Sequence, residues 1–175
     1  MTDDGLPIVD AFVALGANVG DRLAALSRAV AALDARPDTA VVARSAVYET
    51  EALVLPGADP QPDHLNAVVA LRTSLRPYAL LRALSDLERA AGRDRRAARW
   101  APRPLDLDLL LYADARIDSA GLVVPHPALA ERRFVLAPLA DVAASRAVPG
   151  LGQTVAALLA ACADTGRVER TDLAL

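Results

Sequence analysis

The stretch from residue 105 to residue 112, which reads LDLDLLLY, constrains the fold more than any other part of the chain. Leucine and aspartate alternate at its start with a period of two, which predicts a β-strand. Successive side chains of a strand point to opposite faces of the sheet. Asp106 and Asp108 should therefore stand together on one face. The leucines expected on the other, core-facing side are Leu105, Leu107, Leu109 and Leu111.

Two carboxylates that share a strand face repel each other unless a positive group lies between them. Mg²⁺ meets that need, because it binds oxygen ligands and is commonly held by one or two carboxylates together with substrate phosphates. The preceding loop carries guanidinium groups, which suit phosphate oxygens. Its arginines are Arg93, Arg95, Arg96, Arg99 and Arg103. The two features together indicate a polyphosphate site in which Asp106 and Asp108 are the metal ligands.

Both features also have an ordinary structural explanation. An alternating strand with one solvated face is common in antiparallel sheets, and a run of arginines is often only a solvated loop. The adjacency of several guanidinium groups to two aspartates favours the phosphate site. A Walker-type or kinase lysine is excluded, because all 19 basic residues are arginine. The net charge of −3 provides no basic field for nucleic acid, and the single cysteine, Cys162, excludes an internal disulfide.

The order of the expected elements is βαββαβ, an α+β arrangement of the ferredoxin-like type, with two helices on one face of an antiparallel sheet. The strands are expected at residues 8–15, 40–50, 66–73 and 105–112, and the helices at 21–34 and 77–91. The leucine faces would meet these helices and leave the face of Asp106 and Asp108 free for ligands. Asp21 is placed to cap the first helix, and Pro77 to open the second.

The whole chain, residues 1–175, is expected to form one domain, with a core at about 8–112 and an extension at about 113–175. The extension would contain helical segments at 132–144 and 155–165 and a short strand, Val123–Val124, added to the sheet. No apolar run reaches the length of about 18 residues that a membrane span needs, and the first five residues do not resemble a signal peptide. We therefore expect a cytoplasmic, monomeric protein without a membrane or nucleic-acid partner.

The run RWAPRPLDLDLLLY at residues 99–112 resembles the signature of the 6-hydroxymethyl-7,8-dihydropterin pyrophosphokinases of folate biosynthesis. The turn GANVGD at 16–21, PDHLN at 62–66 and VPH at 124–126 are similar to further segments of that family. The resemblance covers about residues 12–141. It implies a Mg²⁺-dependent enzyme that transfers diphosphate from ATP to the hydroxymethyl group of the pterin and releases AMP.

The resemblance also implies residue roles on the nucleotide side. The matching aspartates, Asp106 and Asp108, hold two Mg²⁺ ions that bridge ATP and the pterin hydroxymethyl group. His126 corresponds to a histidine that contacts an ATP phosphate, and Glu88 to a position that lines the nucleotide sugar or base site. We interpret the triphosphate clamp as Arg93, Arg95 and Arg103, joined by Arg132. Arg93 and Arg103 are expected to act in catalysis with the two aspartates.

On the pterin side, Asn66 corresponds to the asparagine that hydrogen-bonds the ring, and a neutral amide suits a ring edge with mixed donors and acceptors. Phe134 matches the aromatic residue that stacks on the pterin, and Trp100 closes over it. Thr50 and Leu53 match positions that supply mainly backbone contacts. The chain departs from the family pattern at His64, which replaces the usual Tyr or Phe, at Glu51-Ala52, which replaces a proline-rich loop start, and at Gly121, where some relatives have an arginine.

Two other functions stay open on the residues alone. A ferredoxin-like sheet also serves in RNA-recognition domains, although these stack bases on sheet-face aromatics, where this chain offers aspartates. A phosphotransferase of the same fold acting on another alcohol is the second alternative. Only the resemblance, through Asn66, Phe134 and Trp100, argues against it.

Overall fold

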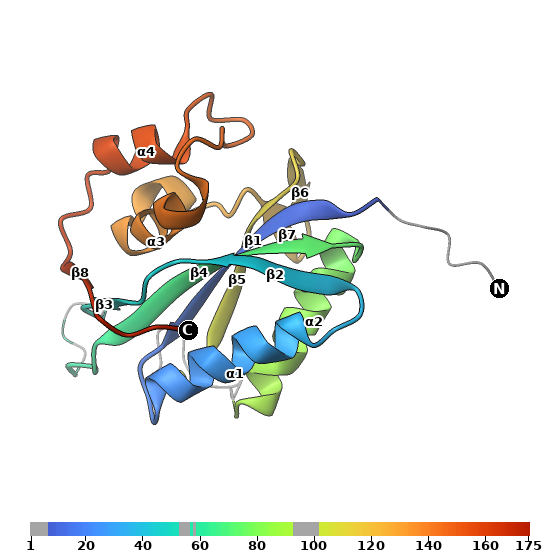
Figure 1. Ribbon diagram of the computed structural model, residues 1–175. Helices are drawn as coiled ribbons and strands as arrows, with labels where there is room; N and C mark the ends of the chain where they lie inside the picture. The colour runs from blue at the N-terminus through green and yellow to red at the C-terminus, as the bar shows by residue number, and fades with distance from the viewer. Residues whose placement is uncertain (1–6, 53–56, 58, 93–101) are drawn as a thin grey trace.

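The computed structural model describes residues 7–52, 57, 59–92 and 102–175. Figure 1 shows a central sheet between two layers of helices. The strands are β1 (Val9–Ala17), β2 (Thr39–Arg44), β3 (Tyr48–Thr50), β4 (His64–Thr73), β5 (Asp106–Tyr112), β6 (Ile117–Ser119), β7 (Leu122–Val124) and β8 (Val168–Arg170). The helices are α1 (Arg22–Asp34), α2 (Pro77–Ala90), the 3-10 turn Leu129–Glu131, α3 (Arg133–Ala143) and α4 (Val155–Ala161). In the described ranges, no helix combines the length and the apolar character needed to cross a membrane.

The main sheet has the strand order β5-β1-β4-β3-β8, with β2 paired to the other half of β4, and every pairing is antiparallel. The single strand expected at residues 40–50 is therefore two strands. Ser45 occupies the break between them, where its backbone N–H donates to the Val68 carbonyl and its hydroxyl accepts from the Val68 N–H. These bonds satisfy backbone groups that the interruption would otherwise leave unpaired.

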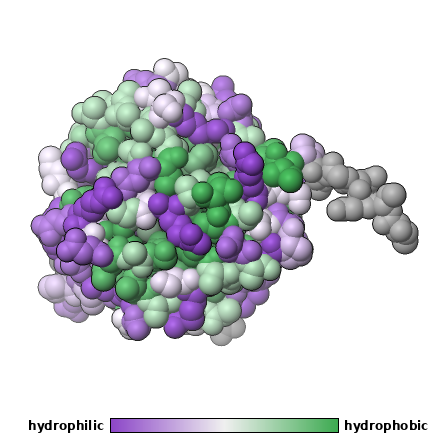
Figure 2. Space-filling model, viewed as in Figure 1, coloured by the Kyte–Doolittle hydropathy of each residue, from purple (hydrophilic) through white to green (hydrophobic). Residues whose placement is uncertain are grey.

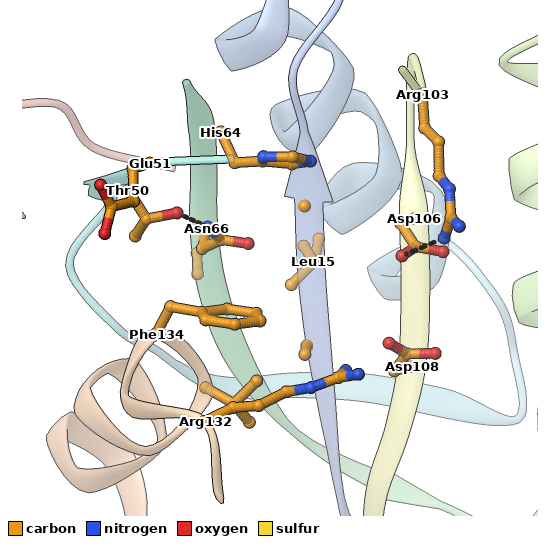
Figure 3. A pocket seen from close by; sticks show the side chains of 14 residues that line it. Leu15, Thr50, Glu51, His64, Asn66, Arg103, Asp106, Asp108, Arg132 and Phe134 are labelled. Carbon is orange, nitrogen blue, oxygen red and sulfur yellow. Dashed lines mark hydrogen bonds and ion pairs between the residues drawn. The ribbon is translucent and has the colours of Figure 1, made fainter. Parts of the chain in front are cut away.

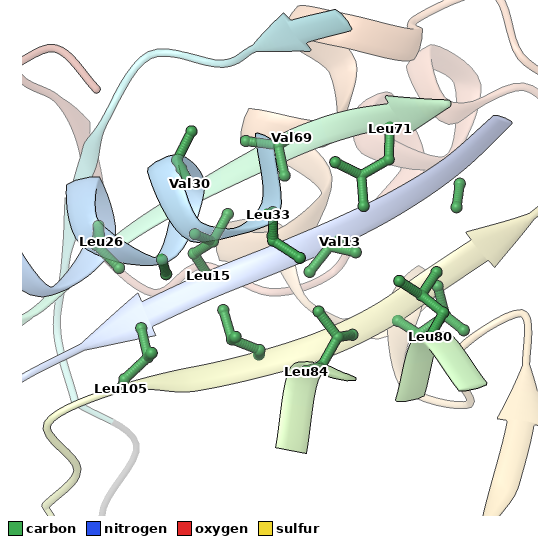
Figure 4. Close-up of a cluster of buried hydrophobic side chains, with 14 of the residues drawn as sticks. Val13, Leu15, Leu26, Val30, Leu33, Val69, Leu71, Leu80, Leu84 and Leu105 are labelled. Atoms are coloured by element: carbon green, nitrogen blue, oxygen red, sulfur yellow. The ribbon is translucent and has the colours of Figure 1, made fainter. Parts of the chain in front are cut away.

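Helices α1 and α2 cover one face of the sheet (Figure 1). Asp21 caps α1 by accepting a hydrogen bond from the backbone N–H of Ala24 at 3.0 Å, and Pro77 is the first residue of α2, both as predicted. The leucine stripes of the two helices meet the sheet in a cluster that Figure 4 shows from close by. Its buried members include Leu26, Leu33, Leu80, Leu84, Leu105, Leu107 and Leu109.

The sequence predicts that the opposite face of the sheet is free, but α3 covers part of it, and α4 packs on the outer side of α3 (Figure 1). They bury a second apolar cluster with members from the sheet and from both helices: Phe12, Val68, Ala70, Leu110, Leu111, Leu136, Leu139, Val155 and Leu158. Leu111 belongs to this second cluster rather than to the face of Leu105. The reason is a register shift between β1 and β5 at Phe12 and Val13, since an extra residue in one strand reverses the alternation that follows it.

The extension differs from the expectation in two further places. Strand β7 does not join the main sheet but forms a two-stranded hairpin with β6. Helix α4 ends at Ala161 instead of continuing to Thr165. The chain then returns to the main sheet as β8, a strand that the sequence did not predict, and pairs with β3. Figure 2 shows apolar side chains interrupted by polar ones over the visible face of the molecule.

Candidate active site

A cavity lies on the second face of the sheet, beside the part that α3 covers (Figure 3). On that face, three neighbouring strands carry apolar side chains at one end and small or polar side chains at the other. Phe12, Val68 and Leu110 belong to the buried apolar cluster, whereas small or polar side chains further along the strands line the cavity. Those cavity side chains are Ala14 and Gly16 on β1, His64 and Asn66 on β4, and Asp106 and Asp108 on β5. The cavity is also lined by Thr50, Glu51, Arg103, Arg132 and Phe134 and by the apolar residues Leu15, Ala67 and Val135.

The floor of the cavity is β1, where small residues allow the side chains of both neighbouring strands to approach. Gly16 pairs with Asn66 on one side and with Asp106 on the other. A Cβ atom at Gly16 would lie 3.0 Å from the Oδ1 atom of Asn66, closer than side chains normally pack. The absence of a side chain at Gly16 therefore makes room for the amide of Asn66.

Asp106 and Asp108 both extend into the cavity from β5, as the alternation predicts (Figure 3). Asp106 forms an ion pair with Arg103, with 2.9 Å between its Oδ2 atom and a terminal guanidinium nitrogen. Across the part of the chain that the structure describes, no group of three or more His, Cys, Asp or Glu side chains is placed to hold a metal by itself. Two carboxylates still fit Mg²⁺, because substrate phosphates and water commonly supply its other oxygen ligands.

Asn18 fixes the position of Arg103, a role that the sequence did not reveal. The side-chain oxygen of Asn18 accepts a hydrogen bond from the backbone N–H of Arg103 at 2.8 Å, and the backbone N–H of Asn18 donates to the Arg103 carbonyl at 3.1 Å. The amide nitrogen of the same side chain reaches Gln61 and Pro62, both at 3.3 Å. Asn18 is buried, so it joins the two loops that flank the cavity. The turn GANVGD contained this signal, because a polar residue between the two glycines serves as a hydrogen-bonding hub.

Asn66 and Phe134 face the cavity from the side opposite Asp106 and Asp108 (Figure 3). The amide nitrogen of Asn66 donates to the hydroxyl of Thr50 at 2.7 Å, which fixes the orientation of the amide. Thr50 therefore orients Asn66 through its side chain. The backbone contact with the pterin that the resemblance implies for Thr50 stays a prediction. The guanidinium of Arg132 lies 5.8 Å from the centre of the Phe134 ring, within the range of a cation–π contact.

Both histidines of the chain are shifted toward the neutral form. Burial lowers the pKa of His64, an effect that Asp106 opposes and Arg103 reinforces. Burial likewise lowers the pKa of His126, where Asp108 opposes the shift and Arg132 adds to it. The Nδ1 atom of His126 accepts from the backbone N–H of Ala128 at 3.2 Å, so the proton of the neutral ring lies on Nε2. His126 lines an adjoining hollow instead of the cavity of Figure 3.

Glu88 is not part of the described cavity lining. Its carboxylate is buried, with 4% of the residue exposed, and accepts a hydrogen bond from the backbone N–H of Leu107 at 2.8 Å. Leu107 lies between the two aspartates on β5, so Glu88 ties α2 to the strand that presents them. The expected contact between Glu88 and the nucleotide stays a prediction.

Eight predicted site residues are brought together in one cavity: Thr50, His64, Asn66, Arg103, Asp106, Asp108, Arg132 and Phe134. Four others, namely Arg93, Arg95, Leu53 and Trp100, lie outside the described residues, as do Arg96 and Arg99. The gathered residues come from four separate segments of the chain. Their assembly on one face combines an amide and an aromatic ring on one side with two carboxylates and two guanidinium groups on the other.

A family model described as 7,8-dihydro-6-hydroxymethylpterin-pyrophosphokinase matches residues 12–144. The chain belongs to this family. A 2-amino-4-hydroxy-6-hydroxymethyldihydropteridine pyrophosphokinase of Methylorubrum extorquens is 42% identical over 163 residues, which are 93% of this chain and 98% of that protein. The Bacillus subtilis protein of the same name is 43% identical over 132 residues, 75% of this chain and 77% of its own length. The family resemblance is thereby confirmed.

Solved structures support the pyrophosphokinase fold independently of close sequence similarity. A Plasmodium falciparum HPPK-DHPS crystal structure matches with a TM-score of 0.69 at 13% identity. A second HPPK-DHPS structure, determined in complex with substrates, also has a TM-score of 0.69 at 13% identity. These matches cover 90% and 89% of this chain but only 46% and 43% of the longer proteins. This chain therefore spans less than half the length of those structures.

Proposed function

We propose that this protein transfers diphosphate from ATP to the hydroxymethyl group of 6-hydroxymethyl-7,8-dihydropterin and releases AMP, a step of folate biosynthesis. The observation that carries the proposal is the pair of carboxylates, Asp106 and Asp108, facing the wall of Asn66 and Phe134 across β1 (Figure 3). A pyrophosphokinase must hold an alcohol and a polyphosphate side by side. This cavity offers the wall of Asn66 and Phe134 for the alcohol and the wall of the two carboxylates, through bound metal, for the polyphosphate.

The pterin would bind on the wall formed by Asn66 and Phe134. The Asn66 amide offers mixed hydrogen-bonding groups to the ring edge, and the bond to Thr50 holds that amide in one orientation. Phe134 would stack on the ring. His64 lines the same cavity, and its neutral imidazole adds no charge there. Trp100 and Leu53 are proposed to complete this side.

ATP would place its phosphates beside Asp106 and Asp108, which are the residues proposed to hold two Mg²⁺ ions. Bound Mg²⁺ supplies positive charge that neutralises the phosphate oxygens. Arg103 pairs with Asp106 in the structure, and its guanidinium can turn to the phosphates once that carboxylate has another partner. His126 can donate from Nε2 to a phosphate oxygen. The proposed clamp also includes Arg132, Arg93 and Arg95, and Glu88 is proposed at the nucleoside end.

Transfer then consists of positioning and charge stabilisation, with no covalent enzyme intermediate. The hydroxyl held at the Asn66 wall attacks the β-phosphorus, the bond between the α,β-bridging oxygen and the β-phosphorus breaks, and AMP leaves. Asn18 contributes indirectly, since it holds the backbone of Arg103 and the loop at Pro62 in one arrangement. Arg103 and Arg93 are proposed to stabilise the charge that develops on the transferred group.

We also propose that the core is ferredoxin-like and that residues 1–175 act as one domain. The order β5-β1-β4-β2, with antiparallel neighbours and α1 and α2 on one face, supports the first statement. The expectations of a monomeric and cytoplasmic protein stay predictions. A phosphotransferase acting on another alcohol remains the alternative that an experiment has to separate.

The decisive experiment identifies the nucleotide product. The protein is incubated with Mg-ATP and the reduced pterin, and the nucleotides are separated by chromatography. We expect AMP and a diphosphorylated pterin in equal amounts, and neither product when the metal is chelated. ADP as the main product would support the other phosphotransferase. Nucleotide turnover that does not depend on the pterin would reject the proposed substrate.

A further inference from the structure

The wall of the cavity that carries the proposed pterin contacts is assembled from three short pieces of chain. Thr50 and Glu51 come from the end of β3, His64 from the first residue of β4, and Phe134 from the first turn of α3. None of these pieces lies in the middle of a long element. Their relative positions therefore depend on what joins them from outside the cavity.

The segment that joins them is the C-terminal stretch 164–170, which we call the C-terminal brace. Its strand β8 pairs with β3, so that Thr50 lies between His64 on β4 and Val168 on β8. β3 has only three residues, and two flanking strands hold it. The brace continues beyond β3, because the backbone N–H of Arg167 donates to the Glu51 carboxylate at 3.0 Å, and the Glu51 N–H donates to the Arg167 carbonyl at 3.4 Å.

The guanidinium of Arg167 forms an ion pair with Asp63, the residue directly before His64. The backbone carbonyl of Asp63 also accepts a hydrogen bond from Arg22 at 2.7 Å. Asp63 is thus held from both sides at the point where β4 enters the cavity. The brace therefore contacts the second piece of the wall as well as the first.

The third piece is the start of α3. The N-cap residue of this helix, Arg132, makes no side-chain capping bond. Asp164 supplies the cap instead, since its carboxylate accepts a hydrogen bond from the backbone N–H of Arg133 at 2.9 Å. A carboxylate at a helix N-terminus satisfies a free N–H and complements the helix dipole. Phe134 follows directly, so the cap holds the turn that presents this ring.

Gly166 lies between the carboxylate of Asp164, which caps α3, and the carboxylate of Glu51, which follows β3. A Cβ atom at this position would lie 3.0 Å from Oδ1 of Asp164 and 3.1 Å from Oε1 of Glu51. The Gly166 N–H donates to that same oxygen of Asp164 at 2.9 Å. A side chain at this position would crowd both carboxylates, so the glycine favours the close approach of the segment to α3 and β3.

We infer that the C-terminal brace positions the pterin-side wall of the cavity, with Asp164 and Arg167 as its positioning residues. The inference rests on the proposed function, because it assigns these residues a role in pterin binding. Neither residue lines the described cavity, so neither touches the substrate. Arg167 is 39% exposed at its side chain, and exposed ion pairs contribute little to stability. Its removal should therefore move the wall without unfolding the protein.

The test compares Arg167→Ala and Asp164→Ala with wild type by calorimetric titration of the reduced pterin in the presence of Mg²⁺ and an unreactive ATP analogue. We expect the pterin Kd to rise about fivefold for Arg167→Ala and about tenfold for Asp164→Ala, because small displacements of a binding wall weaken binding strongly. For Arg167→Ala the Kd of the ATP analogue should stay within about twofold, since Arg167 contacts neither the carboxylate wall nor the start of α3. Asp164→Ala should also weaken nucleotide binding, because the helix start that Asp164 caps carries Arg132 of the proposed clamp. The Asp164→Asn variant keeps only one of the two acceptor oxygens, so it can accept from Arg133 or from Gly166 but not from both. Its pterin Kd should lie between those of wild type and Asp164→Ala.

The matched control is Arg36→Ala. Arg36 is 38% exposed and forms a two-bonded ion pair with Asp38 at 2.9 and 3.0 Å, but neither residue lines the cavity. This variant should leave both Kd values unchanged. Asp63→Ala should raise the pterin Kd as much as Arg167→Ala does. The double variant Asp63→Ala, Arg167→Ala should bind the pterin no more weakly than either single variant, because both changes remove the same contact.

Three outcomes decide the inference. Unchanged pterin affinity in both alanine variants, or equal loss of pterin and nucleotide affinity in Arg167→Ala, would overturn it and indicate a merely structural segment. Because the Kd does not depend on turnover, a wild type that binds the pterin but makes no AMP would reject the proposed reaction while the variants still decide the role of the brace. A wild type that binds no pterin would overturn both statements.

Discussion

At the scale of single residues, the pair Asp106 and Asp108 is the part of the site on which the proposed reaction depends most. We predict that Asp106→Ala and Asp108→Ala each lower turnover by about a hundredfold or more, because each removes an oxygen ligand from the proposed metal site. The fold should persist, since each change relieves repulsion between like charges on one strand face. Turnover and circular dichroism of each variant measure the two effects.

The control for this prediction is Asp86→Ala on α2, whose carboxylate is 56% exposed and pairs with Arg89 at 2.8 Å. It changes the net charge by the same amount and should leave turnover unchanged. Turnover within about tenfold of wild type in an Asp106 or Asp108 variant would remove that carboxylate from the metal role.

His64 provides a second residue-scale test, since it stands where the family usually has Tyr or Phe. If His64 stacks on the pterin, His64→Tyr should keep or tighten pterin binding, because the phenol ring offers a larger apolar face. Titration of the pterin measures the effect. A loss of more than about tenfold, equal to about 1.4 kcal/mol, would show that the imidazole acts by another contact, such as one involving nearby Asp106.

At the scale of elements, the contact between α2 and β5 controls how the two aspartates are presented. Glu88→Ala would leave the backbone N–H of Leu107 without this acceptor in a buried place, which costs about 1–3 kcal/mol. Glu88→Gln keeps an acceptor oxygen and should be much less destabilising. Urea unfolding measures the difference between the two variants. Equal stability of both would show that the bond to Leu107 does not hold the strand.

Local signals predicted the elements that form the site, as particular residues show. The alternation at Asp106 and Asp108 predicted both the strand and the shared face, and Asp21 and Pro77 marked the helix starts. These features are encoded by neighbours in the sequence. The shift that moves Leu111 to the other face depends on the pairing of β5 with β1, which no local pattern reports.

Dependence on distant contacts also explains why the C-terminal elements could not be predicted from the sequence. β8 is a three-residue strand, and only its pairing with β3 makes it one. Asp164 caps a helix that begins 31 residues earlier, so no local capping pattern exists. Asn18 likewise acts through residues far away in the chain, although its turn was recognised. The residues that line the cavity were thus predictable from motifs, whereas those that hold them in place depend on tertiary contacts.

At the scale of the whole molecule, the site exists because the second helical layer is shorter than the sheet. The apolar cluster under this layer contains Phe12, Val68 and Leu111, and beyond it the same face carries small and polar residues. An apolar core and a polar cavity thus share one sheet face. Substrate-binding groups are anchored on strands whose other ends are buried, which restricts their motion.

This arrangement also makes the stability of the whole molecule depend on pH. Burial lowers the pKa of both His64 and His126 in the folded protein, whereas an unfolded histidine titrates at about 6.5. Above the unfolded pKa both states are neutral at these positions, so stability is at its full value. As the pH falls below about 6.5, the unfolded chain takes up protons that the folded protein resists, and the free energy of unfolding decreases.

We therefore predict that the urea midpoint of the metal-free protein stays constant from about pH 8 to pH 7 and falls between about pH 6.5 and pH 5.5. The double variant His64→Gln, His126→Gln should show a smaller fall over the same interval, because it no longer contains the two groups that cause the difference in bound protons. Asp106 and Asp108 oppose the lowering of the histidine pKa values. Asp106→Asn should therefore lower the pKa of His64 further and make the urea midpoint fall more steeply as the pH decreases. A midpoint that rises as the pH falls from 7.5 to 5.5 would contradict the prediction, since it would require folded histidines that bind protons more tightly than unfolded ones.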